Sequence, residues 1–209
     1  MNQVENKIDF GEFFFNLMSK RRSIRSFSKT PIDKKIIINA IKTAATAPSG
    51  ANAQPWYFVL VTDQEIKNQI RSAAEEVEHQ FYTQDSTKNW VRDLLPLGTN
   101  SLKPFLSEAP ALIVVFSKTH NEDVSGEMKK TYYQNESCGI AVGILITALH
   151  QLGLGTLTHT PRPMLFLNKL FNLSGLYKPY MIVVTGHPDK NFIPPKISRK
   201  NLNEVMASY

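Results

Sequence analysis

Three long apolar segments most constrain the fold of this chain. The runs "APALIVVFS" (109–117) and "PYMIVVTGHP" (179–188) lack the polar alternation of a strand with one face in water. They are typical of strands that are covered on both faces. Between them, "NESCGIAVGILITALHQLGL" (135–154) is apolar on nearly every side, which is typical of a helix in the core. The sequence therefore predicts a helix-covered sheet of the α/β type.

Helical spacing and capping residues predict three further helices. One runs from Phe10, after the capping residue Asp9, to Lys20. A second covers residues 30–47, with Pro31 near its start. A third covers residues 63–82, which repeat apolar side chains opposite a charged face.

The remaining segments are expected to be strands, loops and an extended tail. Residues 56–62 read as a strand, and 155–163 as a strand end that two prolines break. Residues 83–105 contain two prolines and a glycine, so we expect this segment to be loop-rich or mobile. The tail from Pro194 has little apolar pattern and is expected to extend along a partner subunit.

Composition excludes several classes of protein. The 209 residues carry a formal net charge of +6, but the basic residues are scattered, which argues against nucleic-acid binding and suits small acidic ligands. The longest apolar stretch, Gly139 to Leu149, is shorter than the ~20 residues of a membrane-spanning helix. No signal peptide is visible, and the single Cys138 excludes a cysteine-cluster metal site. We expect a cytoplasmic protein without a bound metal.

A basic motif follows the first predicted helix. In an extended segment, Arg21, Ser23 and Arg25 would place two guanidinium groups and a hydroxyl on one side, beside Arg22. These donors match phosphate oxygens, although a solvated basic turn is the commoner meaning of such a cluster. The chain contains neither a GxxxxGK[ST] loop nor a GxGxxG fingerprint.

The motifs "RRSIRSF", "APSGANAQPW" and a late "SRK" together resemble the FMN-dependent nitroreductase superfamily over nearly the whole chain. The resemblance implies one α+β domain, residues 1–209, whose mixed, mainly antiparallel sheet is covered by helices. It also implies a homodimer with the C-terminal tail on the partner. The residues that it implies for FMN binding are Arg21, Arg22, Ser23, Arg25, Ser49, Gly50, Asn52 and Arg199.

Residues 75–105 resemble the active-site lid of the iodotyrosine deiodinase branch of this family. The resemblance implies that Glu78, Tyr82 and Lys103 hold the amino-acid end of a halotyrosine. Glu78 and Tyr82 are four residues apart on a predicted helix and share a face. A carboxylate for an ammonium, with an amine and a phenol for a carboxylate, suits a zwitterion. Spacing alone is more typical of a surface salt bridge.

The segment "TLTHTP" resembles the strand that crosses the flavin in the same branch. It implies Thr160 as the catalytic hydroxyl at flavin N5, with Thr158 and His159 beside the cofactor; a structural hydroxyl before Pro161 is the alternative. His159 departs from the expected pattern. A lone histidine is more often structural, so we leave it out of the catalytic set.

The implied function is FMN-dependent reductive dehalogenation of a halotyrosine, with the backbone N–H of Ala51 at the phenolate oxygen and an external, NAD(P)H-linked reductant. Asn52 and Gln54 look more like general nitroreductases. A general NAD(P)H-dependent nitro- or quinone reductase is therefore the alternative, and a non-enzymatic flavin carrier or sensor is a third. The anchor of some deiodinases is expected to be absent.

Overall fold

The computed structural model describes residues 3–84, 88–122 and 125–209 and is built on a four-stranded sheet. Its strands are β1 (Trp56–Val61), β2 (Ala111–Lys118), β5 (Gly155–His159) and β6 (Tyr177–Gly186), in the order β1-β2-β6-β5. Each neighbouring pair is antiparallel, and Ser23 adds a parallel bridge to Thr156. The α+β prediction from the family resemblance is confirmed. The α/β type expected from the apolar runs is wrong, because two-sided burial does not require parallel strands.

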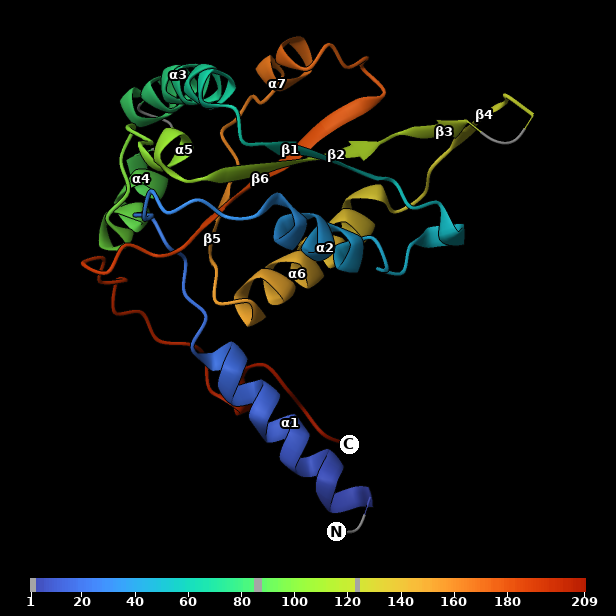
Figure 1. Cartoon of the computed structure of the whole chain (residues 1–209), viewed down its shortest axis with the longest axis vertical. Coiled ribbons are helices and arrows are strands. Elements are labelled where there is room, and N and C mark those ends of the chain that lie inside the picture. Colours follow the sequence, from blue (N-terminus) through green and yellow to red (C-terminus); the bar gives the residue numbers. More distant parts are fainter. Residues whose placement is uncertain (1–2, 85–87, 123–124) are drawn as a thin grey trace.

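Helices cover both faces of the sheet (Figure 1). On β2, Leu112, Val114 and Phe116 point into one apolar layer, and the intervening Ile113 and Val115 point into the other. The first layer is completed by α3 (Gln64–Thr83), α5 (Phe105–Glu108) and α7 (Phe166–Leu170). The second is completed by α2 (Lys34–Ala44) and α6 (Gln134–Gln151). The two predicted runs therefore lack alternation because both of their faces are buried.

Two predicted helix starts differ from the structure. Helix α1 spans Gln3–Ser19, so Asp9 lies inside it and does not cap it, because the preceding residues continue the same helix. Helix α2 begins at Lys34, where Asp33 caps it by accepting a hydrogen bond from the Lys35 N–H at 2.8 Å. Pro31 therefore precedes the helix.

Residues 83–105 contain more helix than expected. Helix α4 (Lys88–Leu94) leads into a 3₁₀ turn, η3 (Leu95–Leu97), and α5 begins at Phe105. The breakers bound these short helices: Pro96 occupies the first turn of η3, and Gly98 ends it with a left-handed φ of 64°. The three residues 85–87, within the segment predicted to be mobile, lie outside the described residues.

Helix α1 and the C-terminal tail extend together away from the sheet (Figure 1). Apolar side chains of α1 are open to solvent, with Phe10, Phe13 and Phe15 each more than 60% exposed. The tail from Pro194 is extended apart from a 3₁₀ turn, η4 (Leu202–Glu204), that an Asn201–Glu204 capping box closes. Helix α6, predicted to be central, is buried on one face only, because Ile140 remains 46% exposed.

Short elements complete the chain. A hairpin of β3 (His120–Glu122) and β4 (Met128–Lys130) precedes α6, and a 3₁₀ turn, η1 (Gly50–Asn52), precedes β1. These elements and α7 are only three to five residues long, too short to leave a repeated pattern in the sequence. In the part of the chain that the structure describes, no helix is long and apolar enough to cross a membrane.

Candidate active site

A cavity of about 360 Å³ lies where α3 and the 83–105 segment meet the end of β5. Its lining combines charged, hydroxyl and aromatic side chains from parts of the chain that are distant in sequence. The predicted residues that it brings together are Arg25, Glu78, Tyr82, Lys103, Thr158, His159 and Thr160. Residues that sequence reasoning missed also line it, namely Val77, Phe81, Trp90, Leu94, Thr99, Phe105, Leu157 and Arg162.

An ion pair between Glu78 and Lys103 occupies one side of this cavity. Lys103 Nζ lies 3.1 Å from Glu78 Oε2, and the two side chains are only 3% and 14% exposed. The ammonium also lies 5.2 Å from the centre of the Tyr82 ring, a cation–π contact. This burial is not that of a surface salt bridge on an amphipathic helix, and the three side chains meet as the family resemblance implied.

Contacts with neighbouring residues hold both the backbone and the side chain of Lys103 in place. Its backbone N–H donates to Glu75 Oε1 at 2.6 Å, and Arg71 holds the same carboxylate from one turn earlier, at 2.8 Å. Lys103 Nζ also donates to the Asn100 carbonyl and to Thr99 Oγ1. Burial lowers the pKa of the Lys103 ammonium, and the Glu78 carboxylate opposes that shift. The amine is thus held in a buried place that favours a negatively charged partner.

Tyr82 presents a hydroxyl that the protein leaves unpaired. Among the described residues its Oη has no hydrogen-bond partner although it is buried; the Thr99 side chain lies near but outside bonding geometry. Burial raises the pKa of this phenol, so it is a neutral donor at neutral pH. A buried donor without a partner is costly, which is typical of a group that serves a ligand.

The segment 21–25 runs beside β5 and delivers Arg25 to the cavity. The Ile24 N–H donates to the Thr156 carbonyl at 3.0 Å, and Ile24 anchors the segment in the core. Arg25 then follows into the cavity that Thr158 and Thr160 line. Burial lowers the pKa of the Arg25 guanidinium, and the nearby Tyr82 opposes the shift.

Arg21, Arg22 and Arg199 form a second cluster at the end of α1. Arg199 donates to the carbonyls of Ser19 and Arg21 at 3.0 and 2.9 Å, and Arg22 donates to the same two carbonyls. Burial, followed by the charges of Arg199 and Arg22, lowers the pKa of Arg21. Among the described residues no acidic side chain pairs with these three cations. Unneutralised guanidinium groups held together are suited to an anion with several oxygens.

The predicted flavin loop, Ser49 to Gln54, lies elsewhere. It precedes β1, whereas the cavity lies beside β5, and β1 and β5 are the two edge strands of the sheet. Ala51, Asn52 and Gln54 all have left-handed backbone, with φ of 51°, 53° and 45°. The Gln54 N–H donates to Ser49 Oγ at 2.9 Å. One chain therefore brings together the residues predicted for the amino-acid end, but not the loop predicted for the flavin ring and the phenolate.

The β3–β4 hairpin supports this loop. Asn121 Nδ2 donates to the Ala53 carbonyl. A side chain at Gly50 would stand 3.1 Å from the Tyr133 ring and 3.2 Å from the Tyr132 carbonyl oxygen, so only glycine fits there without displacement. No sequence signal identified Asn121 or the tyrosines as supports.

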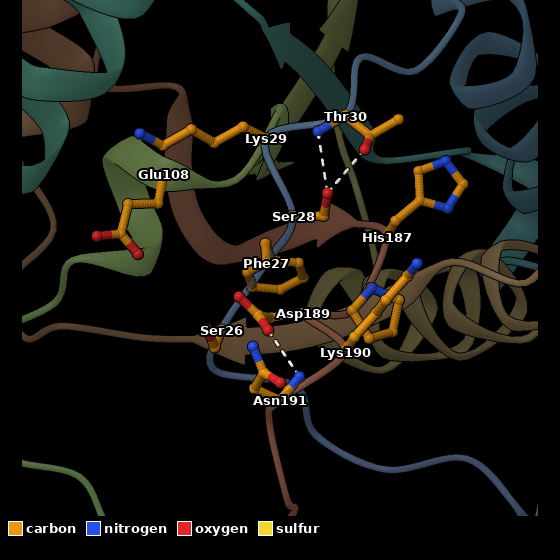
Figure 2. Close-up of a pocket in the computed structure, with 11 residues that line it drawn as sticks. Ser26, Phe27, Ser28, Lys29, Thr30, Glu108, His187, Asp189, Lys190 and Asn191 are labelled. Carbon is orange, nitrogen blue, oxygen red and sulfur yellow. Dashed lines mark hydrogen bonds between the residues drawn. The ribbon is translucent and has the colours of Figure 1, made fainter.

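A larger and more open cavity, about 860 Å³, lies between segments 26–30 and 187–191 (Figure 2). Its lining carries both signs of charge, including Lys29, Glu108 and Asp189. Figure 2 shows hydrogen bonds between residues that both line the cavity: Ser28 Oγ with Thr30, and Asp189 Oδ1 with Asn191. None of the predicted site residues lines it. Size alone does not make it the functional site.

The fold and the charged cavity define an α+β domain built to enclose a small polar ligand. The family model described as Nitroreductase family matches residues 18–187, and the chain belongs to that family. It is 44% identical to the iodotyrosine deiodinase of Haliscomenobacter hydrossis over 196 residues, 94% of this chain and 88% of that one. It is 41% identical to the iodotyrosine deiodinase of Danio rerio, covering 98% of this chain and 70% of that one.

A solved structure agrees with these relatives. A crystal structure of oxidized iodotyrosine deiodinase bound to FMN and 3-iodo-L-tyrosine superposes with a TM-score of 0.78 and 34% identity, over 94% of this chain and 98% of that chain. A BluB-like flavoprotein of Clostridium difficile has a TM-score of 0.71 at 21% identity, with 93% and 97% covered, which shows the shared fold alone.

Proposed function

We propose that the protein is an FMN-dependent oxidoreductase that reductively removes halide from a halotyrosine, yielding tyrosine. The buried group of Glu78, Tyr82 and Lys103 carries the proposal, because it offers an anion, a hydroxyl and a cation to one zwitterion. The relatives named iodotyrosine deiodinase support the same substrate class. Glu78 would accept the ammonium, and Lys103 with Tyr82 would donate to the carboxylate.

The residues present fit an FMN. The cluster of Arg21, Arg22 and Arg199 has the charge and donors for its phosphate, and Arg25 for the pyrimidine edge, where the reduced ring carries negative charge. Thr160 would hold a hydroxyl at flavin N5, with Thr158 and His159 beside it. Bound FMN would supply two electrons, which an external NAD(P)H-linked reductant replaces. In the net reaction the carbon–halogen bond breaks, halide leaves, and a proton takes its place on the ring.

The site is proposed to be shared between two copies of the chain. Ser49, Gly50, Ala51 and Asn52 precede β1, at the other edge of the sheet from the cavity beside β5, so a second copy would bring them to it. The exposed aromatic face of α1, the open face of α6 and the extended tail offer the apolar surface that a stable dimer buries. In this arrangement the Ala51 N–H of the partner would meet the phenolate oxygen.

Residues 75–105 are proposed as a lid over the substrate in a single domain of residues 1–209. The lid carries the proposed zwitterion-binding side chains on α3 and two residues before α5. Closing it would exclude water and fix the ring against the cofactor. The cytoplasmic location and the identity of the reductant remain predictions.

The decisive experiment is an anaerobic titration of the reduced holoprotein with 3-iodotyrosine. Flavin oxidation and release of iodide should proceed together in a one-to-one ratio. Flavin oxidation by nitroarenes or quinones without iodide release would instead indicate a general reductase. No oxidation by either class would indicate a flavin carrier or sensor.

A further inference from the structure

His159 is a buried polar residue in this cavity whose ring nitrogen has no partner. It ends β5, is 8% exposed, and its Nε2 is buried without a hydrogen-bond partner among the described residues. The Tyr82 Oη is the other unpaired buried atom of the same lining. Buried polar atoms without partners are uncommon, and two in one cavity indicate that a ligand completes both.

The surroundings of His159 select the kind of ligand group. The Phe105 ring meets the imidazole edge-on, with centroids 5.5 Å apart, and so fixes its plane. Burial, followed by the charge of Lys103, lowers the pKa of His159 to about 3, so the ring is neutral at neutral pH. A neutral ring can place an N–H beside the Lys103 ammonium without repelling it, and the two donors suit one anion.

We propose that His159 is a specificity-determining residue that donates from Nε2 to the carboxylate of the amino-acid substrate, completing a receptor with Lys103 and Tyr82. The inference rests on the proposed function and deepens it. It moves His159 from the cofactor side, where the family resemblance placed it, to the substrate side. Glu78 then binds only the ammonium of the substrate, and the other three side chains bind its carboxylate.

A core histidine that merely packs against Phe105 is the competing explanation. The two explanations predict different effects when His159 is substituted. A phenylalanine keeps the packing and removes Nε2, whereas a glutamine puts an amide near the position of Nε2. They also differ in ligand dependence, because packing would affect every ligand of the cavity alike.

The test is fluorescence titration of the oxidised FMN holoprotein with three ligands. They are 3-iodotyrosine, 3-iodotyramine, which lacks the carboxylate, and 3-(4-hydroxy-3-iodophenyl)propionate, which lacks the ammonium. His159→Phe should weaken binding of the two carboxylates about tenfold, as expected for one lost hydrogen bond, and leave 3-iodotyramine within about twofold. His159→Gln should recover the carboxylates to within about threefold of the wild type.

An equal loss for all three ligands, no loss in His159→Phe, or no recovery in His159→Gln would each overturn the inference. A second readout uses ¹⁵N-labelled histidine. The Nε2 resonance that His159→Gln removes should shift on addition of 3-iodotyrosine but not of 3-iodotyramine. If the wild type binds 3-iodotyrosine and releases iodide but these tests fail, only the role of His159 falls. If the wild type binds no halotyrosine, both proposals fall.

Discussion

The cavity beside β5 and the loop before β1 contrast in how the fold holds functional groups. In the cavity, one chain buries two opposite charges and pairs them, Lys103 with Glu78 at 3.1 Å. In the loop, Ala51 and Asn52 stand exposed in left-handed backbone, held by Ser49 Oγ and the β3–β4 hairpin. The charged groups of the cavity are positioned by contacts within one chain, whereas the loop presents its backbone outward.

This contrast suggests a division of labour. Buried charge pairs are costly to desolvate and are destabilising when one partner is lost, so they suit a region that must recognise a charged ligand closely. Left-handed residues outside glycine are also costly and persist where surrounding contacts enforce them. Both regions thus carry a cost that packing offsets; in the proposed function, the first would serve the zwitterion and the second the cofactor and the phenolate.

Complementation between two chains, each with one defective region, tests most directly whether the cavity and the loop of one site come from different chains. One chain carries Lys103→Met and an intact loop; the other carries Gly50→Val, whose side chain would collide with Tyr132 and Tyr133. With 3-iodotyrosine held near the Kd of the wild type, well below that of the Lys103→Met protein, each homodimer should release little iodide. Refolded together at equal amounts, half of the dimers are mixed and each has one intact site, so about a quarter of wild-type iodide release should return. No recovery in a confirmed mixed dimer would place the loop and the cavity of one site in the same chain.

Lys103→Met tests whether the charged end of the cavity binds the zwitterion. It removes the buried ammonium but keeps an apolar side chain of similar length, and it leaves Glu78 without its partner. Binding of 3-iodotyrosine should weaken by roughly 1.5–3 kcal/mol, about ten- to a hundredfold in Kd. 2-Iodophenol, which lacks the zwitterion, should bind both proteins weakly and alike. Equal 3-iodotyrosine affinity in both proteins would return the assignment to a general reductase.

The same two regions mark how far the sequence could predict the molecule. The buried strands and α3 followed from apolar pattern, because burial on two faces leaves an unbroken apolar run and burial of one helix face leaves an apolar repeat. Glu78 and Tyr82 shared a predicted face, but that Lys103 meets them depends on how residues 83–105 turn. The orphaned Nε2 of His159 and the support of the loop by Asn121 arise from tertiary packing, which leaves no local pattern.

The basic cluster at the end of α1 lies outside both regions, and Arg199→Ala tests its link to the cofactor. Loss of one charged donor to phosphate should weaken FMN binding by roughly 1.5–3 kcal/mol. Lys200→Ala is the matched control, because it removes the neighbouring positive charge without the contacts that Arg199 makes to Ser19 and Arg21. FMN fluorescence titration of the apoproteins measures both. Equal weakening in the two variants would mean that general charge, and not a specific contact, retains FMN.

The smallest expected effect concerns the buried imidazole and the dependence of stability on pH. The pKa of His159 is about 3 in the folded protein and about 6.5 in an unfolded chain, so between these values the unfolded state binds the additional proton. Folding stability contributed by the neutral ring is therefore present above pH 6.5 and is lost as the pH falls below it. From pH 7 to 5.5 this group should lower the free energy of unfolding by about 1 kcal/mol.

His159→Gln removes the titrating ring, so its unfolding free energy should fall less over that interval, while the two curves run parallel above pH 7. Urea unfolding of the FMN holoproteins at four pH values measures the difference. Parallel curves down to pH 5.5 would mean that the imidazole can take up its proton in the folded state. In that case burial beside Lys103 and Phe105 would not keep the ring neutral. The groups of the cavity would then be held less firmly than the contrast with the loop assumes.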